Sequence, residues 1–438
     1  MTTFQINPYV ESIVMPENLL VGLMVAEQRK KCRGGCKDDF AALAIGQSPF
    51  HVPPPLAKAL GEHAAKGHYS AAEGIAELRE AIAGFNKRYF NLDVEPDRIV
   101  VGSGTKDLIF TIFTMINGHV IIPSPSWIGY YPQLKLLGRH YHTYYLDPEK
   151  DYRIQPKELD DYLSGLRDDE HQHLLVLNNP NNPTGVVYSR SELEEIARVC
   201  RRNNTLVLAD EIYALSTYEF GSFTSMGLIY PEGTFVTNGL SKDRSAGGYR
   251  LGACFLPRQE SGELRKNFTK IAATVYTNVS TPTQYAAVAA YEPNAEIEEY
   301  FTVTRNIHRM MGMFMSRAFN RIDGIRATTP QGAFYFYADF NKLADKLRAR
   351  SVMTSNDLGQ SLLSHPFHVA TITGDAVMAR PDDYCARIAF VDYDGKVAFD
   401  NYRANPPQTP AEEEAFVRKN APRMVAGIDK LQQYVNWL

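Results

Sequence analysis

The chain has little cysteine, only two tryptophans and no long apolar run. Five cysteines are scattered over 438 residues, which is typical of a reducing compartment rather than of a disulfide framework. No stretch approaches the roughly 20 apolar residues that a membrane-spanning helix needs. The segment from Met1 to Met15 lacks the basic start and apolar run of a secretory signal. These absences favour a cytoplasmic protein without a membrane partner.

An excess of charge of one sign is missing as well. The chain carries 46 basic and 50 acidic residues, a formal net charge of -4, so nothing suggests nucleic acid as a partner. Cys32 and Cys36 are close in sequence, but no second Cys/His pair with ligand spacing follows, and we expect no metal site. The hydrophobic share of 44% is ordinary for a globular protein, and the length allows roughly two or three domains.

The most informative stretch surrounds Lys242. Apolar runs over Thr234–Asn238 and Arg250–Leu256 predict two short buried strands, which places Lys242 in a loop at strand ends. Most lysines are solvated surface charges, but a lysine in this setting is partly desolvated, so its amine is more easily deprotonated and can form a Schiff base. Arg250 offers a planar fork for a phosphate, and the nearby glycines allow close backbone approach. A Schiff-base lysine beside a phosphate-binding arginine indicates pyridoxal phosphate.

Three motifs then resemble those of the class I/II aminotransferases, the fold-type I enzymes that use pyridoxal phosphate. The first is the serine-lysine pattern, which is filled by Ser241, Lys242, Gly248, Tyr249, Arg250 and Gly252. The second is the run Asn179–Gly185, which reads asparagine-proline-x-asparagine-proline-threonine-glycine. The third is Asp210 at the end of the apolar strand Leu206–Ala209. The resemblance spans roughly residues 40 to 435, with one departure: Gly239 stands where the family often has a serine.

The resemblance implies an α/β fold with two parts. A three-layer large domain with a mainly parallel central sheet is expected over residues 51–300, and a smaller α/β domain over 301–438. Residues 1–50 are expected to form an N-terminal arm and part of the small domain. From the sequence pattern we also expect a strand over Ala41–Gly46, an exposed polar insertion over Tyr393–Pro410, and one terminal amphipathic helix.

The resemblance also assigns cofactor roles. Lys242 would hold pyridoxal phosphate and move the substrate proton, and Asp210 would pair with the pyridine nitrogen. Asn182 and Tyr213 would hydrogen-bond the phenolate oxygen. Trp127 would stack on the ring, although a tryptophan just past a strand end can simply pack in the core.

Phosphate and substrate contacts complete the expected site. A small-residue turn that enters a helix offers free N–H groups to a phosphate, although the same turn fits an ordinary strand-helix connection. The expected phosphate ligands are Ser103, Gly104, Thr105, Ser241, Arg250 and, from the neighbouring subunit, Tyr69. The expected substrate contacts are Arg387 for the α-carboxylate, Asn182, and backbone near Gly46, which also reads as a plain turn glycine.

The activity so implied is transamination between an L-amino acid and a 2-oxo acid by a homodimer. A pyridoxal-phosphate lyase, synthase or oxidase remains an alternative, since the serine-lysine-aspartate run also occurs in aminocyclopropane-carboxylate synthases; a non-catalytic pyridoxal-phosphate-binding protein is another. Asp243 and Arg244 have no assigned role. No arginine occurs between Lys270 and Tyr291, where the family places the partner's contact to a distal carboxylate. We therefore expect neutral or aromatic donors to be preferred over aspartate, unless another cation such as Arg244 turns into the pocket.

Overall fold

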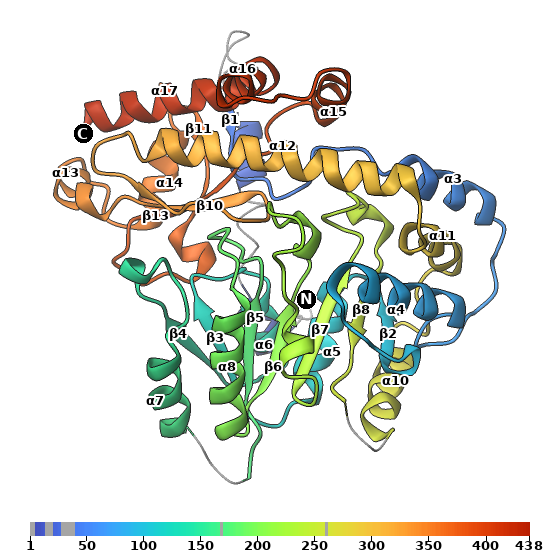
Figure 1. The fold of residues 1–438 in the computed structure, drawn as a ribbon. Coiled ribbons are helices and arrows are strands. Elements are labelled where there is room, and N and C mark those ends of the chain that lie inside the picture. Colours follow the sequence, from blue (N-terminus) through green and yellow to red (C-terminus); the bar gives the residue numbers. More distant parts are fainter. Residues whose placement is uncertain (1–4, 14–20, 28–39, 167–169, 259–261) are drawn as a thin grey trace.

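A seven-stranded sheet forms the centre of the molecule (Figure 1), a computed structural model that describes residues 5–13, 21–27, 40–166, 170–258 and 262–438. Cys32 and Cys36 lie outside the described residues. The strands are β2 (Ile99–Gly102), β8 (Gly252–Phe255), β7 (Thr234–Gly239), β6 (Leu206–Asp210), β5 (Leu174–Asn178), β3 (Val120–Ser124) and β4 (Tyr141–Tyr145), in that spatial order. Only β8 is antiparallel to its neighbours. The expected mainly parallel sheet is confirmed.

Helices cover both faces of this sheet, so the strands are apolar on both sides. Val176 and Leu208 belong to one buried cluster, whereas Leu175 and Val207 point into the other. Helices α5 (Thr105–Met115), α6 (Tyr130–Leu136) and α10 (Glu263–Val275) pack on the first face. The second face carries α4 (Ala76–Phe90), α7 (Pro156–Leu166), α8 (Arg190–Arg202), α9 (Met226–Ile229) and α11 (Thr281–Tyr291). Because parallel strands need cover on both faces, a three-layer arrangement results.

A second sheet lies above the first in Figure 1. It is antiparallel, in the order β12 (Ile372–Thr373), β13 (Cys385–Ala389), β10 (Tyr335–Asp339) and β9 (Arg326–Ala327). The long helix α12 (Ala295–Phe319) runs from the large-sheet layers across to this sheet. A short parallel pair, β1 (Ala41–Ala42) with β11 (Val369–Ala370), ties the N-terminal part of the chain to the C-terminal part.

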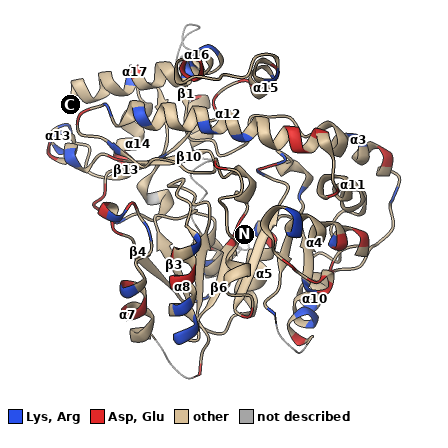
Figure 2. Cartoon of the chain, in the orientation of Figure 1, with Lys and Arg blue, Asp and Glu red and all other residues tan. Residues whose placement is uncertain are grey.

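The remaining helices lie outside these layers. They are α1 (Pro8–Glu11), α3 (Pro54–His63), α13 (Ala344–Ala349), α14 (Ser355–Leu363), α15 (Gly395–Ala404), α16 (Pro410–Asn420) and α17 (Pro422–Trp437). Residues 21–27 are also helical. Figure 2 shows charges of both signs spread over the outer helices rather than gathered on one face. No helix in the described ranges is long and apolar enough to cross a membrane.

Two local expectations need correction. Much of the segment Tyr393–Pro410 is exposed as expected, but it contains helix α15, which Asp394 caps by accepting from the Val397 N–H at 3.0 Å and which buries Ala398. The chain does end in a helix, α17, which starts at Pro422 because proline cannot continue α16. The strand from Ala41 is two residues long and stops before Gly46.

Candidate active site

Polar side chains meet where three parallel strands of the large sheet end. Asn178 ends β5, Asp210 ends β6 and Thr237 lies beside it on β7, and these residues are in register across the sheet. The Asn178 amide Nδ2 donates to the backbone oxygen of Asp210 at 2.8 Å. The carboxyl ends of parallel strands form the usual ligand-binding edge of an α/β sheet.

Asp210 is a buried carboxylate with one unused oxygen. Its Oδ2 accepts a hydrogen bond from the Tyr130 hydroxyl at 2.7 Å, and burial raises the pKa of Asp210 to about 6. Its Oδ1 is buried and accepts no hydrogen bond of good geometry among the described residues, although the Ile212 N–H and the Thr237 hydroxyl lie close enough to lower the pKa of Asp210. An unsatisfied buried carboxylate oxygen is costly, so this oxygen is suited to a cationic N–H donor supplied by a ligand.

The asparagine-proline run after β5 folds into a turn that holds Asn182. Asn178 Oδ1 accepts from the Asn182 backbone N–H at 2.6 Å, and Gly185 closes the turn with a φ of +72°. The side chain of Asn182 is buried, and its Oδ1 lies 3.4 Å from Nη1 of Arg387. The structure therefore brings Asn182 and Arg387 together as the sequence predicted.

Arg387 lies in the middle of β13, only 6% exposed. Its Nη2 donates to the Ala44 backbone oxygen at 2.6 Å, and its guanidinium lies 4.6 Å from the ring centroid of Tyr335. Its Nε has no partner, and no acidic side chain in the described ranges forms an ion pair with it. A buried guanidinium without a counter-ion favours binding of a carboxylate from outside the chain.

Lys242 lies three residues after β7, beside Gly46. The ammonium Nζ donates to the Gly46 backbone oxygen at 2.8 Å and lies 5.6 Å from the ring centroid of Tyr213. The Tyr335 hydroxyl lies 3.3 Å from the same backbone oxygen. A Cβ at Gly46 would collide with that hydroxyl, so the site requires a glycine here.

The turn before α5 forms the expected cradle at a helix N-terminus. Gly104 has a φ of +89°, and no side chain caps the first turn of the helix. Arg250 donates through Nη2 to the Ser103 backbone oxygen at 3.1 Å and through Nη1 to the Gly247 backbone oxygen at 2.7 Å. The Ser103 N–H already donates to Asp107 Oδ2 at 3.1 Å, and the Gly104 N–H donates to the Gly102 backbone oxygen at 2.7 Å. The N–H groups that follow, at the start of α5, have no intrahelical acceptor, and beside an exposed guanidinium they make an anion site.

Two glycines allow the strands to approach this cradle. A Cβ at Gly252 would lie 2.8 Å from the Thr105 nitrogen, and a Cβ at Gly239 would lie 2.7 Å from the Leu251 backbone oxygen. Both distances are too short for any side chain. The glycine at position 239, the one departure from the expected motif, thus has a local steric reason.

Trp127 follows β3 and is half-buried. Its ring meets that of Tyr130 edge-on, with 5.0 Å between centroids and an angle of 89°, and Lys106 Nζ lies 5.4 Å from the Trp127 ring. Burial, then the charges of Arg250 and Lys242, lower the pKa of Lys106. The tryptophan therefore lies between the phosphate cradle and the residue that supports Asp210.

Two predicted residues make no side-chain contact with this group. Tyr69 is 86% exposed and forms no hydrogen bond or ring contact with another described residue. Ser241 is half-buried and forms no side-chain hydrogen bond within the described part of the chain. Neither position contradicts a role toward a bound group or a second subunit.

Four contributors were missed by the sequence reasoning: Tyr130, Tyr335, Asn178 and Lys106. Asn178 ends a buried strand in the same way as Asp210, so its position after an apolar run could have identified it. Tyr130 is one of 25 tyrosines, and nothing in its local pattern separates it from core tyrosines. Tyr335 ends the run Gly332-Ala333-Phe334-Tyr335, which resembles a family hairpin entry, but that pattern assigned it no role in the site.

Arg244 and Asp243 form a buried structural pair. Arg244 is 1% exposed; its Nη1 donates to Asp243 at 2.9 Å and its Nε donates to the Ala290 backbone oxygen at 3.1 Å. The guanidinium packs 4.5 Å from the ring centroids of Phe85 and Tyr291. Burial raises the pKa of Asp243. Arg244 is therefore held in the core and does not turn into the pocket.

Comparison with solved structures first identifies the fold. An alanine aminotransferase from Pyrococcus furiosus superposes with a TM-score of 0.80 at 24% identity, covering 99% of this chain and all of the other. The predicted fold type is thereby confirmed.

Sequence comparison then identifies the family. A family model described as aminotransferase class I and II matches residues 38–393. The aspartate aminotransferase of Bacillus sp. (strain YM-2) is 31% identical over 351 residues, which is 77% of this chain and 84% of that protein. The aspartate aminotransferase of Bacillus subtilis (strain 168) is 31% identical over 328 residues, 72% of this chain and 79% of that protein. The chain belongs to the class I and II aminotransferases.

Proposed function

We propose that this aminotransferase uses pyridoxal phosphate, attached through Lys242, to exchange an amino group between an L-amino acid and a 2-oxo acid. The observation that carries the proposal is the buried Oδ1 of Asp210, which accepts no hydrogen bond of good geometry within the described ranges. It lies at the same sheet edge as the loop that carries Lys242. A protonated ring nitrogen is the donor that this oxygen lacks.

The residues present fit the whole cofactor. The cradle of Gly104, Thr105 and Arg250 would hold the phosphate, together with the Ser241 hydroxyl. Asn182 and Tyr213 would donate to the phenolate oxygen, and Trp127 would cover one face of the ring. Burial and the neighbouring Tyr335 hydroxyl hold the pKa of Tyr213 well above its ordinary value, so Tyr213 keeps the proton that it would donate.

When bound, pyridoxal phosphate supplies an electron sink for the substrate's Cα. The chain supplies the rest. Asp210 keeps the ring nitrogen protonated, since a carboxylate within hydrogen-bond distance favours the charged form. Lys242, whose Nζ here rests on the Gly46 carbonyl, carries the proton that leaves or returns to Cα.

Arg387 would orient the substrate by its α-carboxylate. The guanidinium is held by Ala44, Asn182 and the Tyr335 ring, so its direction is set before substrate arrives. A preorganised fork reduces the entropy lost on binding and holds Cα near Lys242.

A homodimer would complete the site, because Tyr69 is exposed and forms no hydrogen bond or ring contact with the described residues of its own chain. Its exposed ring is free to reach the phosphate of a second copy. We also propose the division into 1–50, 51–300 and 301–438, which is supported by the pairing of β1 with β11. The buried free cysteines Cys200, Cys254 and Cys385 support a reducing cytoplasm.

Covalent attachment is tested by borohydride reduction of the purified holoenzyme followed by peptide mass mapping. The reduced pyridoxyl group is expected on Lys242, and Lys242→Ala should lose both the label and turnover. The exposed Lys58, which pairs with Glu62 at 3.7 Å, serves as the matched control, Lys58→Ala. Label on another lysine of a protein shown to be loaded would contradict the assignment.

The donor amino acid is tested by kcat/KM with a common acceptor. Arg244 is held in the core by Asp243 and the Ala290 backbone oxygen, so it does not supply the cation that a distal carboxylate would need. We expect alanine, methionine or phenylalanine to exceed aspartate, since burying a carboxylate without a cation is costly. Two relatives are named aspartate aminotransferases, and one similar structure is an alanine aminotransferase. Aspartate faster by about tenfold, roughly 1.4 kcal/mol, would show that another cation such as Lys106 lines the pocket.

A further inference from the structure

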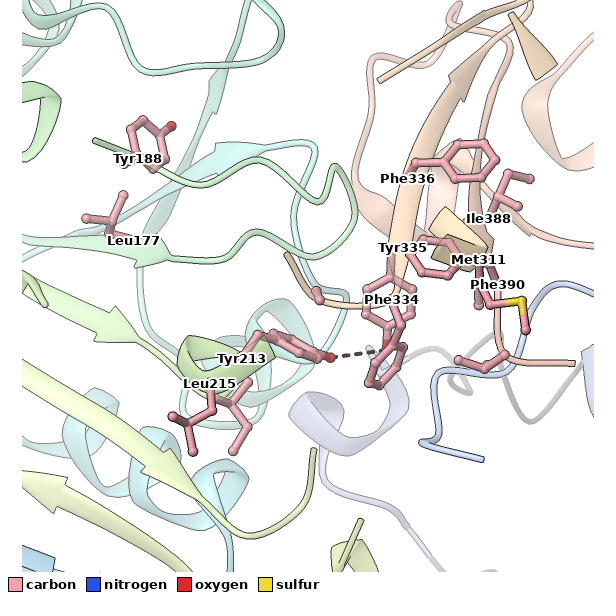
Figure 3. Packing of buried hydrophobic residues seen from close by; sticks show 14 of the residues in the cluster. Leu177, Tyr188, Tyr213, Leu215, Met311, Phe334, Tyr335, Phe336, Ile388 and Phe390 are labelled. Atoms are coloured by element: carbon pink, nitrogen blue, oxygen red, sulfur yellow. Dashed lines mark hydrogen bonds between the residues drawn. The ribbon is translucent and has the colours of Figure 1, made fainter. Parts of the chain in front are cut away.

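Tyr335 connects the two sheets at the active site. It is the first residue of β10 and lies 1% exposed in the second sheet, yet its hydroxyl reaches Tyr213 on the large-sheet side. Figure 3 shows the two hydroxyls pointing at each other, joined by a dashed line. They are 3.1 Å apart, and the Tyr335 hydroxyl lies 3.3 Å from the Gly46 backbone oxygen.

Proton counting fixes how these groups can share hydrogen bonds. A carbonyl only accepts, so without a ligand Tyr335 donates to Gly46 and Tyr213 donates to Tyr335. Gly46 also accepts from Lys242 at 2.8 Å. If Tyr213 instead donates its hydrogen bond to the phenolate oxygen of a cofactor, Tyr335 no longer accepts from it and can turn its own proton from the Gly46 oxygen to the Tyr213 oxygen.

Three neighbouring side chains pack against the Tyr335 ring and hold it in place. The Arg387 guanidinium lies 4.6 Å from its centroid, Phe334 packs at 4.7 Å, and Tyr213 meets it edge-on at 5.7 Å. The hydroxyl is therefore fixed in direction by packing and does not need the cofactor to orient it.

We propose that Tyr335 is a positioning residue that donates to the Tyr213 hydroxyl and so strengthens the hydrogen bond from Tyr213 to the cofactor's phenolate oxygen. Donation into a hydroxyl makes that hydroxyl a better donor. The phenolate form of the cofactor is then stabilised over its protonated form. This inference rests on the proposed function.

The test is a pH titration of the visible absorption band of the loaded protein. In Tyr335→Phe the ring and its contact with Arg387 remain while the hydroxyl is lost. The phenolate form loses support, so the midpoint should rise by about 0.5 to 1 pH unit, the size of one neutral hydrogen bond. KM for the amino acid should change less than twofold. In Tyr335→Leu, where the ring is also lost, KM should rise in addition.

The matched control is Tyr230→Phe, which removes a buried hydroxyl that donates to the Thr205 backbone oxygen at 3.3 Å in the lower part of the large sheet. Its midpoint should equal that of wild type. An unchanged or lowered midpoint in a folded, loaded Tyr335→Phe would overturn the inference. If wild type itself gives no visible band with pyridoxal phosphate, the proposed function fails, so the two failures are distinguishable.

Discussion

The two sheets contribute to the site in different ways. On the large sheet the functional side chains lie at or just past the strand ends: Asn178, Asp210, Tyr213 and, in the next loop, Lys242. On the smaller sheet they lie within strands, Tyr335 at the start of β10 and Arg387 in the middle of β13. Strand-end residues share one edge because the strands are parallel and in register. Arg387 instead meets the large-sheet side through Asn182, 205 residues away in sequence, at 3.4 Å.

The difference separates two chemical tasks. The large-sheet edge presents an acceptor without a donor, Asp210 Oδ1, whereas the smaller sheet presents a donor without an acceptor, Arg387 Nε. The first suits a cation on a cofactor, and the second suits an anion on a substrate. Changes at Asp210 should therefore affect the chemical step, and changes at Arg387 should affect substrate binding.

The largest effect is expected from Asp210→Asn. An amide cannot hold the proton on the ring nitrogen, so kcat should fall about 100-fold or more, the range seen when one aimed electrostatic contact is removed. The measurement is single-turnover kinetics on protein whose cofactor content is matched to wild type. The control is Asp339→Asn, at the end of β10, where Asp339 accepts a hydrogen bond from the Asn341 N–H at 2.7 Å. Near-normal turnover in Asp210→Asn would mean that Asp210 does not act in the chemical step.

A smaller effect, and on a different parameter, is expected from Arg387→Gln. Loss of a charged hydrogen bond to the carboxylate should raise KM for both substrates about 10- to 100-fold, with the cofactor band unchanged. Arg326→Gln, on β9 of the same sheet and paired with Glu149 at 2.7 Å, should leave KM unaltered. A fall in kcat with constant KM would assign Arg387 to the chemical step instead.

The smallest effect concerns stability, at the residue next to Asp210. Glu211 is 3% exposed and accepts from the Ser225 hydroxyl at 3.0 Å and the Met226 N–H at 2.9 Å; burial raises its pKa to about 8. The unfolded chain releases this proton near the ordinary value of 4.5, so between these values the folded state binds more protons. Stability should therefore fall as pH rises through this window, by up to about 1.4 kcal/mol per pH unit.

The check is urea unfolding of wild type and Glu211→Gln between pH 5 and pH 8. Glutamine keeps the same acceptor oxygen but has no proton to lose, so its stability should depend less on pH in this window. Equal slopes for the two proteins would mean that Glu211 is ionised in the folded state.

Much of the large-sheet edge could be predicted because each residue there follows a buried apolar run. Asp210 after Leu206–Ala209 and the asparagine-proline turn after β5 are local patterns that a linear chain displays. The helix α15 was missed because its polar, proline-flanked sequence resembles a loop. Its stability comes from Asp394 at the cap and from packing of Ala398, and the packing contact is not visible locally.

The order of strands and helices, the motif loops and the residue types at the strand ends follow from apolar periodicity and turn chemistry, which act over a few neighbouring positions. What only the folded chain reveals is which polar atoms are left without partners, and which residues reach the site from afar. Arg244, close to Lys242 in sequence, is buried among aromatic rings, whereas Tyr335, 93 positions after Lys242, touches Tyr213 and Gly46. Burial and hydrogen-bond satisfaction depend on all segments that converge on a point, so no local pattern encodes them.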